Sequence, residues 1–112
     1  MQELKRRLRD FASARDWEQF HSPKNLAMAL SVEVSELVEY FQWLTQEESR
    51  NLSGDKLNAI NSEIADVMIF LTMLADKFGI DPITAAKEKI EINEKKYPVS
   101  LAKGKSDKYT DL

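Results

Sequence analysis

Two short stretches of the sequence place acidic residues inside apolar surroundings. In "ALSVEVSELVEYFQW", Glu33 and Glu36 interrupt a run that is otherwise suited to face a protein core. The stretch "INSEIADVMIFLTMLA" repeats the pattern with Glu63 and Asp66. Residues three apart lie on the same face of a helix, so each pair presents two carboxylates together. Four converging carboxylates repel one another and raise each other's pKa unless a cation joins them, so the pattern predicts a metal site.

The chemistry of the four acids indicates which metal to expect. Oxygen ligands suit Mg²⁺, with Mn²⁺ as a substitute, whereas zinc prefers nitrogen and sulfur ligands. Two alternatives remain beside this interpretation. Acids at this spacing are commonly solvated helix faces, and a di-iron bundle would instead require Glu-x-x-His motifs on two helices. The sequence has a single histidine, His21, in a predicted loop, which disfavours the di-iron alternative.

The elements that must position the acids are helices. Gly and Pro are sparse, with three of each, and they fall where helices would begin or end. Ser22 before Pro23 and Asp81 before Pro82 are typical helix starts, and Gly79 is placed to end a helix. Thr45 and Glu48 have the spacing of a capping box that starts one further turn. The pattern predicts an all-α chain, an antiparallel four-helix bundle, with helices at about 2–15, 23–44, 56–78 and 82–97 and a tail at about 99–112.

On the second and third of these helices the acids occupy the same position relative to the apolar stripe. Glu33 and Glu63 border the stripe, whereas Glu36 and Asp66 lie one step outside it. If the two helices pack through their stripes, the four carboxylates converge on a partly desolvated cleft. The predicted core stripes are Leu26, Leu30, Val34, Leu37 and Phe41 on one helix and Ile60, Ile64, Val67, Leu71 and Leu74 on the other.

Composition limits the class of protein. A chain of 112 residues, 43% hydrophobic, has the length of a single domain over residues 1–112, but it is small enough that burial between subunits would help it. The net charge of −3 gives no general attraction to nucleic acid polymers. The run "VMIFLTMLA" is too short to span a membrane, and no cysteine is present for disulfides. We therefore expect a soluble, cytoplasmic protein that self-associates and binds neither membrane nor nucleic acid.

Two further sets of residues have types and spacing suited to a nucleotide. Lys89, Asn93 and Lys96 share one helix face, with Tyr97 just beyond, and could reach phosphate oxygens; an ordinary lysine-rich solvated face is the alternative. No P-loop or Rossmann glycine motif is present. Aromatic residues that could stack on a base, although core or subunit interface is the alternative, are Trp17, Phe20, His21 and Trp43.

The complete motif set resembles a known family. Glu33-x-x-Glu36, then 26 residues, then Glu63-x-x-Asp66 is similar to the ExxE…ExxD signature of the MazG-like all-α nucleoside triphosphate pyrophosphohydrolases. The segments "RDWEQFHSPKNLAMALSVEVSELVEYFQW", "EIADVMIFL", "NEKKYPV" and "KYTDL" resemble the dCTP pyrophosphatase branch. Vertebrate members of that branch carry a histidine where this chain has Leu8 and a tyrosine where it has Phe70.

The resemblance implies an enzyme that cleaves a nucleoside triphosphate between its α and β phosphorus atoms, with dCTP as the foremost substrate. It implies that the four acids hold Mg²⁺ and carry catalysis, and that the protein assembles as a dimer or tetramer with shared sites. It also implies that Lys89, Asn93, Lys96 and Tyr97 contact phosphates or sugar, and that Trp17, His21, Trp43 and Phe70 surround the base.

Two other functions stay open at this point. One is a hydrolase of the same fold that acts on a broader set of nucleotides or on dUTP. The other is a catalytically silent helical interaction module. The intact set of four acids disfavours the second, because unpaired acids in apolar surroundings are costly to keep.

Overall fold

The computed structural model describes residues 1–106 and 110. Among these residues every regular element is helical, which confirms the predicted all-α class. Of the segment "KYTDL" only Thr110 is described, so this part of the predicted resemblance lies outside the described residues. The elements are α1 (Gln2–Ala14), η1 (Glu18–Phe20), α2 (Pro23–Glu39), α3 (Gln46–Arg50), α4 (Gly54–Asp76), α5 (Pro82–Lys96) and α6 (Val99–Ala102).

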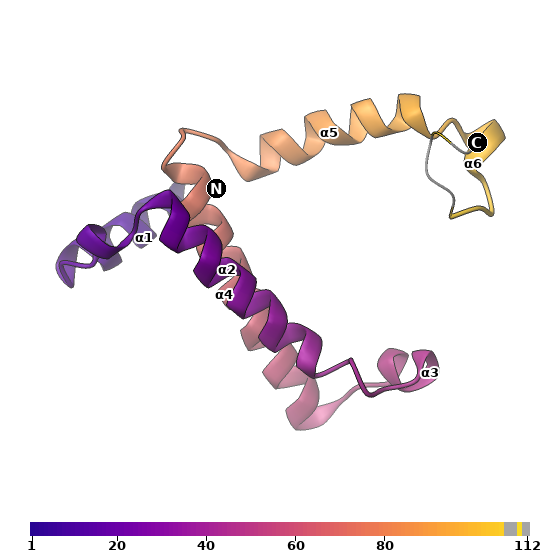
Figure 1. The fold of residues 1–112 in the computed structure, drawn as a ribbon, viewed down its shortest axis with the longest axis horizontal. Coiled ribbons are helices and arrows are strands. Elements are labelled where there is room, and N and C mark those ends of the chain that lie inside the picture. The colour runs from indigo at the N-terminus through magenta and orange to yellow at the C-terminus, as the bar shows by residue number, and fades with distance from the viewer. Residues whose placement is uncertain (107–109, 111–112) are drawn as a thin grey trace. The chain divides into compact units, whose positions relative to one another are not determined.

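The chain divides into two compact units, residues 1–80 and residues 81–112. Three of the four long helices predicted for the bundle, α1, α2 and α4, belong to the first unit, and α5 belongs to the second. In the first unit α2 packs along α4, and α1 packs on α4 as well (Figure 1). The place of α5 in a bundle, and a single domain over the whole chain, stay predictions.

The predicted helix starts are confirmed by their capping hydrogen bonds. The backbone N–H of Asn25 donates to Ser22 Oγ at 3.1 Å ahead of α2. Thr45 and Glu48 form the predicted capping box, with the Thr45 N–H donating to Glu48 Oε1 at 2.9 Å. Asp81 Oδ1 accepts from the first backbone N–H groups of α5. These local bonds satisfy donors that a helix start leaves unpaired.

Gly79 terminates α4 as predicted, although the helix ends at Asp76 and not at the predicted residue 78. Gly79 has a φ of +66°, a conformation that glycine adopts without strain. The N–H of Gly79 donates to the Asp76 carbonyl at 3.2 Å, and the N–H of Ile80 donates to the Ala75 carbonyl at 3.0 Å. This pair of bonds is the Schellman pattern, which pairs the last carbonyls of the helix.

The end predicted for α2 is wrong. The helix was expected to reach Leu44, but it ends at Glu39 and continues as turns. The N–H of Tyr40 donates to the Leu37 carbonyl at 3.2 Å and that of Phe41 to the Val38 carbonyl at 2.9 Å. These bonds reach back three residues, and only the N–H of Gln42 still reaches back four, to the Val38 carbonyl at 2.9 Å. The shorter bonds tighten the chain and end the α-helix.

The apolar core of the described chain is small. Its buried hydrophobic residues are Ala12, Leu26, Ile60 and Ala75. Several residues that were predicted to form core stripes are exposed instead, among them Val34 and Ile64, the latter at 53%. On α4 an exposed apolar stripe, which we call the α4 stripe, consists of Leu57, Ile64, Met68 and Leu71. Too few elements cover these helices within one chain, so the predicted stripes are only partly buried.

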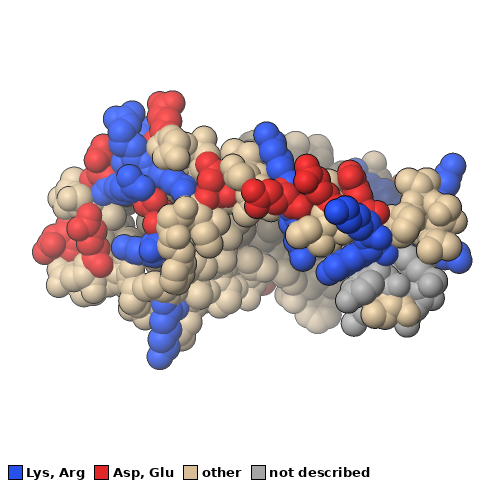
Figure 2. All heavy atoms as spheres, turned by 90° about the horizontal axis from the view of Figure 1, so that it is seen from above, with Lys and Arg blue, Asp and Glu red and all other residues tan. Residues whose placement is uncertain are grey.

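The distribution of charged and apolar residues on the surface is relevant to binding of nucleic acid or membranes. Basic and acidic side chains are interspersed on the face shown in Figure 2. Among the described helices, α4 is long and apolar enough to cross a membrane, by length and composition alone. Core helices of soluble proteins can be equally long and apolar. The expected absence of a membrane or nucleic acid partner stays a prediction.

Candidate active site

Three of the four predicted acids come together. Antiparallel packing of α2 on α4 sets the turn that carries Glu33 and Glu36 beside Glu63. One carboxylate oxygen from each of these three residues lies within 4.8 Å of the other two. All three side chains are half-buried. The sequence pattern therefore predicted a real cluster, formed between helices that are separate in the chain.

Two oxygens of this cluster are buried without a partner. Glu33 Oε2 and Glu63 Oε2 are shielded from solvent and accept no hydrogen bond within the part of the chain that the structure describes. A buried acceptor that is left unpaired costs free energy, and the cost is larger for a charged group. Such atoms indicate that something outside the chain completes the cluster.

The pKa values of the clustered acids also indicate that a cation would stabilise the cluster. Burial raises the pKa of Glu33 to about 7, and the hydrogen bond and charge of Glu36, then the charges of Asp66 and Glu63, act in the same direction. Burial also raises the pKa of Glu63, with the charge of Glu36 as the next cause. The protein thus holds carboxylates where their charged form is disfavoured, unless a cation compensates.

Asp66 lies beside the three clustered acids. Its negative charge raises the pKa of both Glu33 and Glu63, so it shares their electrostatic environment. Its half-buried side chain also lines an adjoining cleft. Asp66 therefore links the carboxylate cluster to the adjoining cleft.

The cluster fits a divalent metal ion. It offers oxygen ligands from three carboxylates, two of which have buried oxygens with unmet bonding capacity. Hard divalent cations take such ligands. His21 does not belong to the cluster, so the Glu-x-x-His arrangement of di-iron bundles is not formed by the described residues.

The cleft beside Asp66 has a volume of about 440 Å³ and mostly apolar walls. Three of the residues predicted to surround a base line it, namely Trp17, His21 and Phe70. The Trp17 ring meets Phe11 edge-on with centroids 5.6 Å apart, and its centroid lies 6.4 Å from that of His21. The cleft is therefore an aromatic pocket that opens next to the acids, and it has the size of a small-molecule site.

Most of the wall that α1 contributes to this cleft was not predicted as part of the site. Leu8 was noted as a position where related proteins carry a histidine, but Leu4, Arg7 and Phe11, which line the cleft with it, were not named as site residues. Their spacing of i, i+3, i+4 and i+7 puts all four on one helix face. A charged residue within an apolar stripe was the signal in the sequence, as it was for the acids.

Trp43 is not brought to the cleft within one chain. It lies beyond the C-terminal end of α2, whereas Trp17 and His21 precede the start of that helix. The 17 residues of α2 span roughly 25 Å. The Trp43 side chain is 87% exposed. Its predicted role at the base stays a prediction.

The predicted phosphate-contacting residues lie in the second unit. Lys89, Asn93 and Lys96 are on α5, and Tyr97 is its C-cap, with its N–H donating to the Asn93 carbonyl at 2.8 Å. Because the two units are described separately, the contact of these residues with a substrate stays a prediction.

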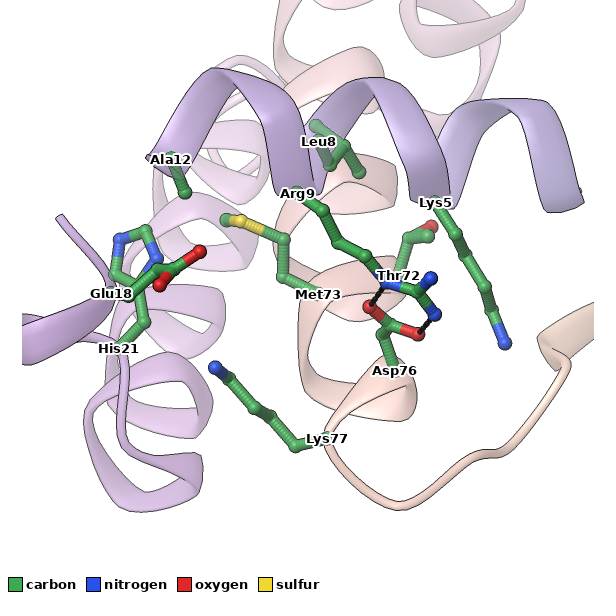
Figure 3. Close-up of a pocket in the computed structure, with 10 residues that line it drawn as sticks. All are labelled: Lys5, Leu8, Arg9, Ala12, Glu18, His21, Thr72, Met73, Asp76 and Lys77. Atoms are coloured by element: carbon green, nitrogen blue, oxygen red, sulfur yellow. Dashed lines mark hydrogen bonds and ion pairs between the residues drawn. The ribbon is translucent and has the colours of Figure 1, made fainter. Parts of the chain in front are cut away.

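A second cavity, of about 50 Å³, lies between α1, the η1 region and the end of α4 (Figure 3). Arg9 and Asp76 span it with two hydrogen bonds, Nε to Oδ2 at 2.7 Å and Nη2 to Oδ1 at 2.5 Å. Lys5, which is 4% exposed, donates to the Ile80 carbonyl at 2.6 Å. These contacts fix α1 on α4 and thereby position one wall of the larger cleft.

Comparison with known proteins identifies the family. The model of the MazG-like family matches residues 28–112. The chain is 42% identical to dCTP pyrophosphatase 1 of Homo sapiens over 114 residues, covering 100% of this chain and 67% of that protein. It is 41% identical to dCTP pyrophosphatase 1 of Bos taurus, covering 100% and 68%. A solved pyrophosphatase from Archaeoglobus fulgidus has a TM-score of 0.77 and 45% identity, covering 88% of this chain and 92% of that one. The acid motif, the helical fold and these matches agree, and the chain belongs to the MazG-like family.

Proposed function

We propose that this protein is a nucleoside triphosphate pyrophosphohydrolase that converts dCTP and water to dCMP and pyrophosphate, and so removes dCTP from the nucleotide pool. The observation that carries the proposal is the cluster of Glu33, Glu36 and Glu63, with two buried oxygens left unpaired. The relatives named dCTP pyrophosphatase 1 support both the reaction and the substrate.

The four acids are the proposed catalytic and metal-binding residues. Glu33, Glu36 and Glu63 would hold Mg²⁺, or Mn²⁺ in its place, and Asp66 would complete the ligand set on the side of the cleft. The bound ion would polarise the triphosphate and lower the pKa of the attacking water. A carboxylate of the set would accept the proton of that water while the water oxygen bonds to the α-phosphorus. The bond from this phosphorus to the bridging oxygen would break, and pyrophosphate would leave.

The aromatic cleft is the proposed base site. Trp17 and Phe70 offer ring surfaces for a flat base, and His21 offers a polar edge. Its volume of about 440 Å³ lies within the range of small-molecule sites. Because Asp66 lines the same cleft, a nucleotide whose base lies there directs its phosphates toward the acids.

The other proposed contacts depend on assembly. Lys89, Asn93, Lys96 and Tyr97 would contact phosphates or sugar, and Trp43 would close the base pocket of a second copy of the chain. The exposed apolar residues of α2 and α4 support a dimer or tetramer, because large exposed apolar surfaces usually mark interfaces. We further propose that the two units work as one domain and that the enzyme is cytoplasmic, which suits a sequence without cysteine.

A substrate panel with pyrophosphate detection tests the function. The protein should release pyrophosphate from dCTP in the presence of Mg²⁺, and EDTA should stop the reaction. Glu36→Gln and Asp66→Asn should abolish turnover while the helical circular dichroism spectrum stays that of the parent, because each removes a ligand charge with little change in size. Glu91→Gln, an exposed acid on α5, is the control and should stay active. Parental turnover in both site variants would refute the proposed site.

A further inference from the structure

Arg7 is the cationic residue in the wall of the aromatic cleft. The α1 face toward the cleft consists of Leu4, Arg7, Leu8 and Phe11, so the arginine lies in the middle of an otherwise apolar stripe. The other residues of the described lining with side-chain nitrogen or oxygen atoms are Trp17, His21 and Asp66. Of these four, Arg7 supplies the largest number of hydrogen-bond donors.

The neighbouring arginines have different contacts. Arg9 is bound to Asp76 in a bidentate ion pair. Arg15 lies 3.7 Å from the centroid of the Phe11 ring and donates to the Phe11 carbonyl at 3.1 Å. Arg6 and Arg7 are both exposed, but Arg6 lines no described cavity. Within the described chain Arg7 forms no hydrogen bond or ion pair, so its guanidinium is available to a ligand in the cleft.

Arg7 lies on the face of α1 that lines the aromatic cleft, together with Leu4 and Phe11. Lys5 and Arg9 lie on the opposite face of this helix, where they contact the Ile80 carbonyl and Asp76. Under the proposed function the phosphates lie next to the carboxylates, so the base lies against the aromatic walls of the cleft that Arg7 shares.

We propose that Arg7 is a specificity-determining residue that donates to the O2 and N3 atoms of the cytosine ring. This inference rests on the proposed function of the cleft as a base site. Cytosine presents two adjacent acceptors on this edge, and the fork of a guanidinium matches two adjacent acceptors. Uracil and thymine carry an N3–H donor at the same place. A donor facing the arginine leaves both groups unpaired, which makes the wrong base unfavourable.

Apolar stacking alone does not supply this selectivity. Rings such as those of Trp17 and Phe70 attract any flat base, because every base has a face on which to stack. Charge alone does not supply it either, since a lysine would attract all triphosphates alike. The proposed selection of cytosine over uracil requires a group with two parallel N–H donors. Among the residues of the described cleft wall, Arg7 carries such a group, the guanidinium.

Two substitutions separate the fork from the charge. Arg7→Lys keeps the positive charge and loses the fork, and Arg7→Met keeps a similar length and helix propensity without charge. The control is Arg6→Met, one residue away on the exposed face of α1. For each protein, kcat/KM is measured for dCTP and for dUTP, and binding of dCMP and dUMP is measured by titration calorimetry.

The expected result is a loss confined to the cytosine nucleotide. Both Arg7 variants should lower the ratio of kcat/KM for dCTP over dUTP by a factor on the order of ten to a hundred, as bidentate base contacts do. The preference for dCMP over dUMP in binding should fall by a similar factor, and Arg6→Met should change neither ratio.

Other results overturn the inference. An equal loss for dCTP and dUTP would place Arg7 at the phosphates, and unchanged ratios would place it outside the site. A parent protein that binds dCMP in preference to dUMP but hydrolyses no triphosphate would refute the proposed reaction and leave the role of Arg7 standing. A parent that binds both monophosphates equally would refute the role of Arg7 whether or not it hydrolyses dCTP.

Discussion

Glu33 on α2 and Glu63 on α4 each turn one carboxylate oxygen into the protein, where no described residue hydrogen-bonds to it. The two oxygens come from different helices, so their burial results from helix packing and not from a local turn. A pair of this kind destabilises the metal-free protein when both groups are charged. It therefore makes the stability of the fold sensitive to pH and to a divalent cation.

The metal-free protein should lose stability as the pH rises. The pKa of Glu33 is raised from an ordinary 4.5 to about 7, so between these values the folded state binds more protons than the unfolded chain. The free energy of unfolding then falls with increasing pH across that window. Thermal melts in EDTA from pH 5 to pH 8 should show the decrease, and Mg²⁺ should reverse it above pH 7. Glu33→Gln should flatten the profile, whereas Glu91→Gln should not; a flat parental profile would contradict the burial of the charge.

The ion pair between Arg9 and Asp76 should stabilise the attachment of α1. The hydrogen bond from Arg9, followed by its charge, lowers the pKa of Asp76. This contribution is present above the ordinary value of 3.8 and is lost as the pH falls through the folded pKa. Asp76→Asn should lower Tm at pH 7. At low pH, where the parent also loses this ion pair, the difference in Tm between the variant and the parent should become smaller. A double-mutant cycle with Arg9→Met should yield a coupling energy, and additivity of the two substitutions would show that the pair contributes nothing.

The α4 stripe should hold copies of the chain together. Met68→Lys places a charge in the middle of this exposed apolar stripe, so it should shift the protein from a dimer or tetramer toward a monomer of 12.9 kDa in size-exclusion chromatography with light scattering. Ser62→Lys introduces the same residue on the exposed polar side of α4 and should leave the assembly intact. A parent that is monomeric and fully active would rule out shared sites.

Trp43 should affect the substrate without affecting the fold. Its side chain is 87% exposed in the single chain, so Trp43→Ala should leave the circular dichroism spectrum unchanged. If a second copy places it against the base, the substitution removes a stacking interaction of about 1–3 kcal/mol, and KM for dCTP should rise accordingly. The ratio of kcat/KM for dCTP over dATP should become smaller. Comparison of kcat/KM for both nucleotides checks this, and equal values for dCTP and dATP in the parent would show that cytosine is not selected.

The parts of the fold that were predictable from the sequence depend on local interactions. The caps at Ser22 and Asp81 and the helix end at Gly79 involve neighbours within a few residues, so the residue types alone indicate them. The early end of α2 was missed because its turns compete with a helix over a small free-energy difference that the residue types do not reveal.

The site was predictable where the signal was a conflict between residue type and position. Glu33 and Glu63 stood out because acids in an apolar stripe are costly, and the packing of α2 on α4 bears this out. Arg7 gave the same signal but was masked by the basic run around it. The exposure of Ile64 and Trp43 was not predictable, because it depends on which surfaces the other helices of the same chain cover.

The carboxylates and the cleft wall come largely from different segments of the chain, and this has an evolutionary consequence. The carboxylates come from α2 and α4, whereas much of the cleft wall comes from α1 and the segment before α2. Under the proposed function, changes in the first 21 residues would alter the accepted nucleotide and leave the acids of the proposed metal site in place. This can be tested with a chimaera in which the N-terminal segment comes from another family member. The segment must keep residues equivalent to Lys5 and Arg9, which contact Ile80 and Asp76. The chimaera should take the substrate preference of the donor protein and keep the metal dependence of this one.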